Sequence, residues 1–237
     1  MKNRPDYGEK LLLITIDGPA GAGKTTVSKI LAERLGYKYI DTGALYRGVA
    51  YEAQKAGVAS DDDTGLEKLC GTLDFEFARD EKGLRLFSNG ADITGEIRTP
   101  GISMLASAVS ARPVVRERLF AIQKELGKEK GAVFEGRDMG TVVFPEAEVK
   151  FYLDASAKTR AKRRHKELAG KKGSPTAAEI ERDIKLRDAN DSNRSLAPLK
   201  PAEDAVIIDS TGLDIETVVN RMLSHIKKRF FLKLPFA

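Results

Sequence analysis

The sequence has few of the residues on which many familiar active sites and extracellular folds depend. Its 237 residues include one cysteine, two histidines and no tryptophan. The single cysteine, Cys70, excludes a disulfide within the chain and favours a reducing compartment; we expect it to be a small core residue. His165 and His225 offer little for a histidine metal site or a Ser-His-Asp triad. The chemistry must therefore be sought in other residue types.

Long apolar runs are also missing. The first ten residues are charged and lack the apolar region of a signal peptide. No apolar run approaches the length that spans a bilayer. The 41% hydrophobic and 32% charged content is typical of a globular protein, and the length suits one large α/β domain with a small insertion. We expect a cytoplasmic protein with no membrane partner.

One stretch organises the chain. The apolar run Leu11–Ile16 reads as a buried strand, and residues 26–35 have the apolar spacing of a helix. Between them lies the sequence DGPAGAGKTT, which contains the phosphate-loop pattern G-x-x-x-x-G-K-[ST]. The residues that fit the pattern are Gly18, Gly23, Lys24 and Thr25.

This pattern predicts a nucleoside triphosphate site. Glycines let successive backbone N–H groups point into one concavity, and the helix N-terminus adds partial positive charge. Lys24 can reach the outer phosphates, and the Thr25 hydroxyl can hold Mg²⁺. A glycine-rich turn without a ligand is the alternative. The expected ATP-binding residues are Gly18, Pro19, Ala20, Gly21, Ala22, Gly23, Lys24, Thr25 and Thr26.

The rest of the chain alternates strands and helices, apart from one interruption. Residues 73–93 alternate like short strands separated by turns, which predicts an inserted antiparallel meander. The expected strands lie at 37–40, 131–135, 149–153 and 205–208. The expected helices lie at 41–57, 60–71, 102–125 with a break near Pro113, a basic helix capped by Asp154 or Ser156, 176–194 and 214–229.

Charged residues lie where such a fold places ligands. Glu135 closes an apolar strand and is a candidate to hold Mg²⁺ through water, although a solvated strand end is an equal alternative. Arg160 can share a helix face with Arg163 or Arg164, either as an ordinary solvated face or as a lid over the transferring phosphoryl group.

A second polar stripe is expected on the helix over 176–194. Arg187, Asp191 and Arg194 fall at i, i+4 and i+7, which places them on one face. A surface pair between Arg187 and Asp191 is the simpler interpretation. Two arginines and a carboxylate on one stripe also suit a ribose and a phosphate.

Several segments together resemble the bacterial cytidylate kinases, a family of nucleoside monophosphate kinases. The phosphate loop is shared by a great many proteins, but the last two segments are far more specific, and the resemblance extends over about residues 11–229. The segments occur in the family's order and are Ile14–Lys24, Asp41–Arg47, Gly136–Pro145 and Arg187–Arg194.

The resemblance implies an α/β fold of the P-loop nucleoside monophosphate kinase type. We expect a parallel five-stranded sheet flanked by helices, with a small antiparallel β insertion and a helical lid. The expected core comprises residues 11–68, 110–155 and 195–237. The expected monophosphate-binding insertion covers about 69–109, and the expected lid covers about 156–175.

The resemblance also implies roles for individual residues. The catalytic residues would be Lys24 and the lid arginines Arg160, Arg163 and Arg164. The ligands of the acceptor phosphate would be Arg47, Arg137 and Arg194, and the ribose contacts Arg187 and Asp191. The cytosine-side and nearby polar contacts would be Thr42, Ser107, Arg116 and Asp138. Thr42 stands where the family often has serine, which keeps the hydroxyl and adds a methyl group.

The implied reaction is transfer of the γ-phosphoryl group of ATP·Mg²⁺ to CMP or dCMP by a monomer without a nucleic-acid partner. A carboxylate can accept a hydrogen bond from the cytosine amino group but not from the uracil carbonyl. A kinase acting on UMP, AMP or a hydroxylated metabolite is the nearest alternative.

Two other classes of function fit less well. A nucleotide-gated switch would need an N-K-x-D segment, which the chain lacks, and its D-x-x-G matches at 80–83 and 92–95 lie in the meander. Nucleic-acid binding through the basic residues 158–172 is disfavoured because no aromatic residues are interleaved with them.

Overall fold

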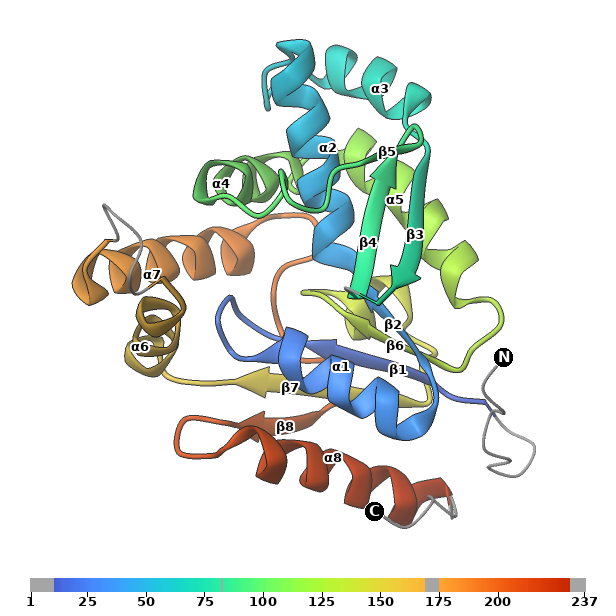
Figure 1. The fold of residues 1–237 in the computed structure, drawn as a ribbon, viewed down its shortest axis with the longest axis vertical. Helices are drawn as coiled ribbons and strands as arrows, with labels where there is room; N and C mark the ends of the chain where they lie inside the picture. The colour runs from blue at the N-terminus through green and yellow to red at the C-terminus, as the bar shows by residue number, and fades with distance from the viewer. Residues whose placement is uncertain (1–10, 82, 169–174, 231–237) are drawn as a thin grey trace. The chain divides into compact units, whose positions relative to one another are not determined.

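The computed structural model describes residues 11–81, 83–168 and 175–230. The chain divides into two compact units, which are described in turn (Figure 1). The first contains the described residues up to Ile40, then 127–193 and those from Ala197 on. The second contains Asp41–Leu126 and Arg194–Leu196.

The first unit is built on a five-stranded sheet of order β2-β6-β1-β7-β8. Central β1 pairs in parallel with β6 and β7, and β7 pairs in parallel with β8. Every residue of β1 is buried, as expected for an inner strand covered on both faces. The expected α/β fold with a parallel sheet is confirmed. The strands are β1 Leu13–Asp17, β2 Lys38–Asp41, β6 Ala132–Glu135, β7 Val149–Asp154 and β8 Val206–Asp209.

Helix α1 (Lys24–Leu35) lies beside α8 (Ile215–Phe230) (Figure 1). Arg34 of α1 forms a 2.7 Å ion pair with Glu216 of α8. Val218, Met222 and Ile226 are buried, which confirms the apolar face predicted for the last helix. Gly36 ends α1 in the left-handed conformation, as expected of a C-terminal glycine.

The pair α6 (Ala157–Leu168) and α7 (Ala177–Asn193) forms a small apolar contact of its own. Ser156 caps α6 by accepting the Thr159 N–H at 3.3 Å, whereas Asp154 accepts the neighbouring Ala155 N–H instead. Thr176 and Glu179 form a reciprocal capping box at the start of α7. Of the two caps predicted for α6, Ser156 is therefore the one that forms.

The second unit contains the predicted meander. Its strands are β3 Phe75–Asp80, β4 Gly83–Ser88 and β5 Ala91–Asp92, paired antiparallel in that order. Its helices are α2 Thr42–Ala56, α3 Asp63–Thr72, α4 Pro100–Val109 and α5 Pro113–Gly127, the last residue of which belongs to the first unit. Pro100 starts α4 at its first turn, where a missing N–H costs nothing, so this helix begins earlier than predicted.

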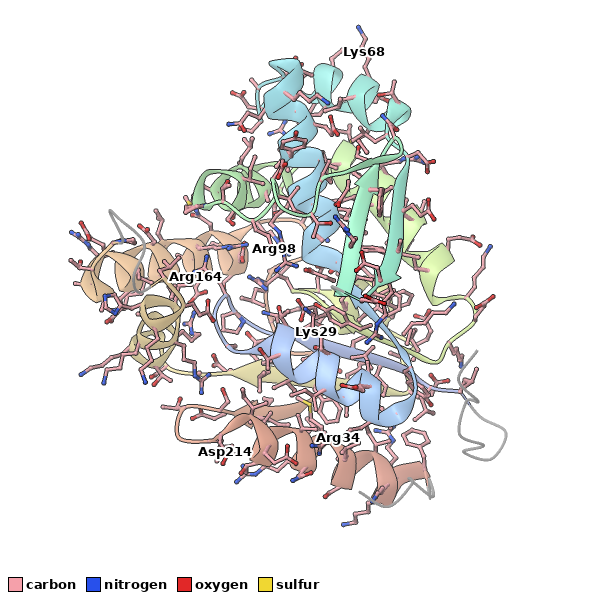
Figure 2. All side chains as sticks on the ribbon, viewed as in Figure 1. Lys29, Arg34, Lys68, Arg98, Arg164 and Asp214 are labelled. Carbon is pink, nitrogen blue, oxygen red and sulfur yellow. The ribbon has the colours of Figure 1, made fainter. Side chains whose placement is uncertain are left out.

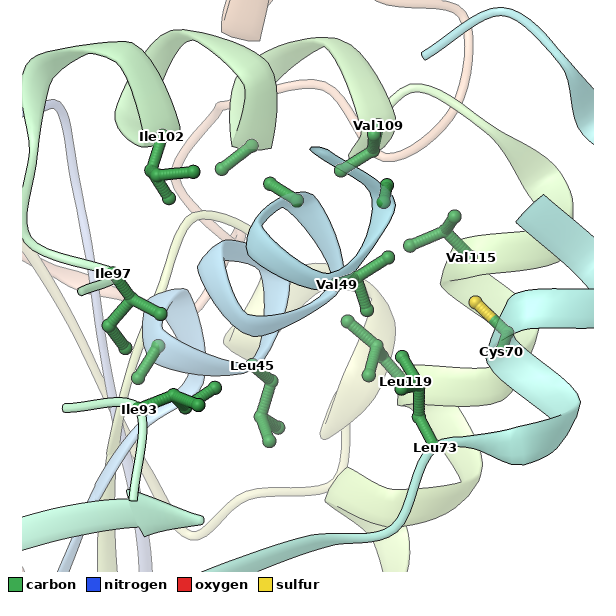
Figure 3. Close-up of a cluster of buried hydrophobic side chains, with 14 of the residues drawn as sticks. Leu45, Val49, Cys70, Leu73, Ile93, Ile97, Ile102, Val109, Val115 and Leu119 are labelled. Carbon is green, nitrogen blue, oxygen red and sulfur yellow. The ribbon is translucent and has the colours of Figure 1, made fainter. Parts of the chain in front are cut away.

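This unit is wider than the insertion expected over 69–109 because α2, α3 and α5 share its core. Leu45 and Val49 of α2 are fully buried against Leu119 of α5 and against residues next to the meander (Figure 3). Cys70 lies in the same cluster at 3% exposure, which confirms its predicted role as a small core residue.

Some sequence expectations fall outside the described residues. These are the charged segment 1–10, residues 169–174 of the expected lid and residues 231–237 of the expected core. Among the helices that the structure describes, none has the length and apolarity needed to cross a membrane.

Candidate functional site

The phosphate loop follows β1 and is shaped by glycine. Gly18 has φ +144°, and a Cβ there would lie 2.0 Å from the Leu153 carbonyl oxygen of β7. Gly23 is left-handed, and no described side chain caps the start of α1. The first N–H groups of α1 are therefore not taken by a side-chain cap, which is the arrangement that binds phosphate.

Helix α1 begins at Lys24, two residues before the predicted start, so the loop runs directly into the helix. The Lys24 Nζ donates to the carbonyl oxygens of Gly18 at 2.7 Å and Pro19 at 2.9 Å. Burial, followed by the positive charge of Arg137, lowers the pKa of Lys24 well below its usual value. A bound triphosphate would add negative charge here and favour the ammonium form.

Two oxygen groups meet at the carboxyl ends of β1 and β6. The Thr25 hydroxyl donates to the Glu135 carboxylate at 2.8 Å, and Glu135 is only 6% exposed. The sequence treated these two residues as candidates for one metal ion, and the structure brings them together. A hydroxyl and a carboxylate are the oxygen ligands that Mg²⁺ prefers, so the donor set fits that ion.

Helix α7 carries two of the candidate acceptor-side residues of the first unit. The Arg137 Nε donates to Asp191 at 2.9 Å, and Asp191 is 4% exposed. Asp191 is therefore not part of a surface pair, contrary to the simpler interpretation of the 187–194 stripe. Since Arg187 lies one turn earlier on α7, the ribose and phosphate candidates of this unit are adjacent.

The second unit holds another arginine near a helix start. Asp41 caps α2 by accepting the Ala44 N–H at 3.0 Å, and its other oxygen accepts from Arg47 at 2.9 Å. A Cβ on Gly43 would approach the Arg47 guanidinium to 3.0 Å, so glycine leaves room for that arginine. Thr42, the first residue of α2, is 1% exposed.

Three further candidates in this unit converge on Ser110, which the sequence gave no reason to select. Its carbonyl oxygen accepts from Arg116 at 3.2 Å, and its hydroxyl accepts from Arg194 at 3.3 Å. The same hydroxyl donates to the Ser107 carbonyl oxygen at 2.8 Å. The arginine at 194 is thus placed by the end of α4 and not by α7.

Arg194 is the one member of the predicted stripe that the helix does not carry. Helix α7 ends at Asn193, and residues 194–196 belong to the second unit. The i, i+4, i+7 spacing assumed a helix that continues through Arg194, so that part of the prediction is wrong. The structure keeps Arg187 and Asp191 on one helix and places Arg194 beside Ser110.

Comparison with known proteins identifies the family. The family model described as "Cytidylate kinase" matches residues 14–228 of the chain. The chain belongs to the cytidylate kinase family. It is 52% identical to a cytidylate kinase of Geobacter sp. (strain M21) over 93% of this chain and 95% of that protein. It is 46% identical to a cytidylate kinase of Pasteurella multocida (strain Pm70) over 94% and 98% of the respective chains.

A solved structure supports the fold. An uncharacterized protein from Eubacterium ventriosum ATCC 27560 aligns with a TM-score of 0.53 and 13% identity, covering 92% of this chain and 99% of the other. At that identity the likeness concerns the fold alone. It agrees with the parallel sheet described above.

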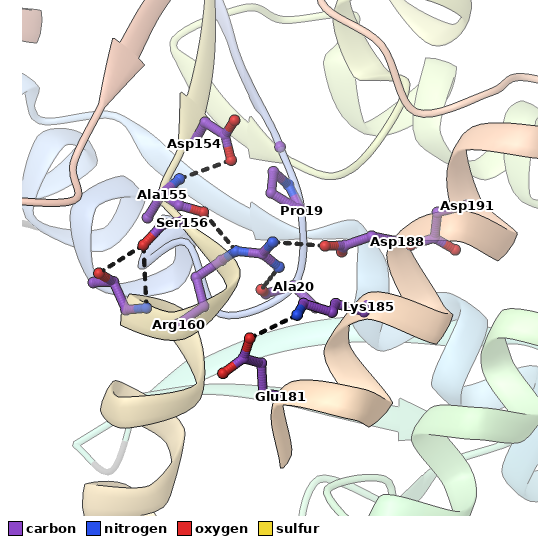
Figure 4. Close-up of polar contacts among 12 residues, drawn as sticks. Pro19, Ala20, Asp154, Ala155, Ser156, Arg160, Glu181, Lys185, Asp188 and Asp191 are labelled. Carbon is purple, nitrogen blue, oxygen red and sulfur yellow. Dashed lines mark hydrogen bonds and ion pairs between the residues drawn. The ribbon is translucent and has the colours of Figure 1, made fainter. Parts of the chain in front are cut away.

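The three arginines of α6 differ in their exposure and in their hydrogen-bond partners. Arg160 is 5% exposed and forms hydrogen bonds to Ala20, Ala155 and Asp188 (Figure 4). Arg163 donates to the carbonyl oxygens of Ala22 and Ser210. Arg164, labelled in Figure 2, has a side chain 44% exposed that pairs with Glu167 one turn on. The alternative of a solvated face therefore holds for Arg164 and is wrong for Arg160.

Sequence reasoning missed Asp17, whose carboxylate is 4% exposed at the end of β1. It accepts the successive N–H groups of Met139 at 2.9 Å and Gly140 at 2.7 Å. These begin the π-helical turn η1 (Met139–Val143), which was also not predicted. Burial raises the pKa of Asp17 to about 6, against the lowering effect of those two hydrogen bonds. A charged residue that ends an apolar strand was the available signal.

Asp138, the candidate for reading the base, precedes this turn. Its side chain is buried at 2% exposure, and its negative charge also raises the pKa of Asp17. Arg137 and Asp138 directly precede η1, and the Asp17 carboxylate at the end of β1 fixes the first two N–H groups of that turn. The Asp17 carboxylate thus links the phosphate-loop segment to the Gly136–Pro145 segment.

Proposed function

We propose that the chain transfers the γ-phosphoryl group of ATP to CMP or dCMP, giving ADP and CDP or dCDP. The observation that carries this proposal is membership of the cytidylate kinase family together with a phosphate loop whose lysine is buried at the start of α1. The attacking group is already a phosphate oxygen, so no dedicated general base is required.

Positioning and neutralisation of charge carry the rate in such a reaction. On the donor side, we assign the N–H groups of the loop to the phosphates and Lys24 to their outer oxygens. The loop segment in these roles is Gly18, Pro19, Ala20, Gly21, Ala22, Gly23, Lys24, Thr25 and Thr26. Bound through Thr25 and, by way of water, Glu135, Mg²⁺ would neutralise phosphate charge.

On the acceptor side, we assign Arg137 to the phosphate of CMP, with Arg187 and Asp191 at the ribose. The Arg137–Asp191 ion pair at 2.9 Å supports this arrangement because it holds a guanidinium in a fixed orientation. Asp138 would accept from the cytosine amino group. The second unit would supply Arg47 and Arg194 at the phosphate, with Thr42, Ser107 and Arg116 near the base.

Other parts of the proposal rest on the sequence and the family. We assign the monophosphate-binding role to the unit that contains the meander and the lid role to α6 with the segment that follows it. Mg²⁺ accompanies ATP, the protein acts as a monomer in the cytoplasm, and nucleic acid is not a partner. Lid closure would exclude water, because a site that stayed wet would hydrolyse ATP.

The test is release of ADP measured in a coupled assay with ATP and Mg²⁺ against CMP, dCMP, UMP, AMP, GMP and no acceptor. We expect strong turnover with CMP and dCMP and weak turnover with the others; in UMP, the uracil carbonyl that replaces the cytosine amino group cannot donate to Asp138. Equal turnover with UMP would overturn the role of Asp138. ADP release without acceptor that matches the rate with CMP would contradict the closure of the site.

A further inference from the structure

Arg160 is the most deeply buried arginine among the described residues of α6, and its three nitrogen groups are all engaged. Its Nε donates to the Ala155 carbonyl oxygen at 2.7 Å. One terminal nitrogen donates to the Ala20 carbonyl oxygen at 2.9 Å, and the other to Asp188 at 2.6 Å. The charge of Arg160 is therefore directed at protein groups (Figure 4).

These three acceptors belong to three different segments. Ala20 lies in the phosphate loop, Ala155 joins β7 to α6, and Asp188 lies on α7. The stem of Arg160 also packs against the loop, since a Cβ on Gly21 would lie 3.2 Å from the Arg160 Cβ. One side chain thus joins the ATP side of the first unit to the helix that carries its acceptor-side residues.

The position of Asp188 on α7 makes this link specific. It directly follows Arg187, the proposed ribose contact, and lies one turn before Asp191, which holds Arg137 at 2.9 Å. A shift of α7 relative to the phosphate loop would therefore move Arg187 and Arg137 together. Phosphoryl transfer is sensitive to such shifts, because the attacking and leaving oxygens must be in line.

For Arg160 to reach a transferring phosphoryl group, it would have to leave the three acceptors and leave the partly buried Asp188 carboxylate without its partner. Leaving Asp188 without its charged partner would cost free energy, because its side chain is only 22% exposed. Arg164 faces no such cost, because it is exposed and pairs only with its helix neighbour Glu167 among the described contacts of its side chain.

We propose that Arg160 is a positioning residue which, held by Asp188, fixes helix α7 against the phosphate loop and does not itself contact the transferred phosphoryl group. This inference rests on the proposed transfer between ATP and CMP and reassigns one of the three lid arginines within it. It requires Arg160 and Asp188 to act as a pair.

The decisive variant is Asp188→Ala, because the two roles of Arg160 predict opposite results. If Arg160 positions α7, releasing it should lower kcat with CMP by about tenfold or more, as for loss of a charge-assisted hydrogen bond. The Kd values of an ATP analogue and of CMP, measured separately, should change less. If Arg160 must leave Asp188 to act on the phosphoryl group, Asp188→Ala should match or exceed the wild-type rate, which would overturn the proposal.

Arg160→Lys gives a second test that does not depend on Asp188. A lysine keeps the charge but cannot reproduce a guanidinium that serves three acceptors. We expect its kcat to fall as far as that of Arg160→Gln, whereas a residue that acts by its charge on the phosphate would keep much of the rate as lysine. In a double-mutant cycle, Arg160→Gln and Asp188→Ala should be strongly non-additive, and additive effects would refute the pair.

Glu181→Ala is the matched control, since it removes the 2.7 Å pair between Glu181 and Lys185, which lies on the same helix and does not include Arg160 or Asp188 (Figure 4). It should leave kcat unchanged. Melting temperatures distinguish lost positioning from lost folding, and a kcat drop that follows the melting temperature alone would contradict the proposal. Absence of turnover in the wild-type protein would refute the proposed function itself, whereas an active wild type with an unimpaired Asp188→Ala would refute only this inference.

Discussion

The two units of the molecule differ in how many charged residues they bury. In the first unit the buried charged residues are Asp17, Lys24, Glu135, Asp138, Lys150, Arg160 and Asp191. In the described part of the second unit, Asp41 is the only buried charged residue, and the interior is a cluster of aliphatic side chains (Figure 3). Buried charge is therefore concentrated in the first unit, whereas apolar side chains are buried in both units.

This difference has a physical basis. Parallel strands of the first unit end side by side, so polar residues that follow them gather at one edge of the sheet, partly out of water. Electrostatic contacts at the site are stronger there because the surroundings have a low dielectric constant. Removing the charges from water costs free energy, so these contacts do not stabilise the fold. The second unit is held by transfer of apolar surface from water. A substitution at a buried charge of the first unit should therefore lower activity more than stability. A substitution in the apolar interior of the second unit should lower stability more than activity.

The largest effect is expected from Lys24→Met in the first unit. It removes the charge that we assign to the outer phosphates, so kcat should fall by about a hundredfold to a thousandfold. Burial already disfavours the charged form of Lys24, as its lowered pKa indicates, so the free energy of unfolding should stay the same or rise. The measurements are the ADP-release assay and urea unfolding without nucleotide, and a large loss of stability would break the comparison.

In the second unit, Leu119→Ala should lower stability and leave activity nearly unchanged. Leu119 is fully buried in the aliphatic cluster, so its truncation should lower the free energy of unfolding by about 3 to 5 kcal/mol. Well below the melting temperature, kcat and KM should stay within about twofold of wild type. The exposed Phe120→Ala, at a side chain 40% exposed, is the control and should cost far less.

Asp17→Asn should produce the smallest and most diagnostic effect. Because burial raises the pKa of Asp17 to about 6 in the folded chain, the folded state binds its proton more tightly than the unfolded state. Its contribution to stability is therefore full below about pH 4 and is lost as the pH rises through 6, by on the order of 2 to 3 kcal/mol.

The free energy of unfolding of wild type relative to Asp17→Asn should accordingly fall between pH 4 and 7 and stay level above that range. Urea unfolding of both proteins at several pH values measures this difference. Parallel curves across the range would mean that the carboxyl group is not buried as the structure has it.

The sequence predicted much of the first unit because its signals are local. The apolar run Leu11–Ile16, the glycine pattern after it and the capping glycine Gly36 each specify backbone geometry within a few residues. The pairing of Thr25 with Glu135 was anticipated only as a shared metal site. It follows from the rule that ligands gather at the carboxyl ends of neighbouring strands.

The failures lie where distant segments meet. The turn η1 depends on Asp17, more than a hundred residues away in the chain, and no local pattern indicates a π-helix at that point. For Arg160 the sequence left a solvated face and a lid as alternatives, and the solvated face is wrong because Asp188 and the Ala20 carbonyl oxygen hold this side chain in a buried position. Arg194 was assigned to α7 by spacing, but the helix ends before it and Ser110 accepts its hydrogen bond.

The amino-acid sequence by itself determined the phosphate loop, the alternation of strands and helices, the inserted meander and the family. Each depends on spacing within a segment or on short segments in a fixed order. Only the tertiary structure decided which charges are buried and which acceptor each guanidinium serves, because desolvation and pairing depend on neighbours that are far apart in the chain. The partners of Asp17, Arg137 and Arg160 are of this kind.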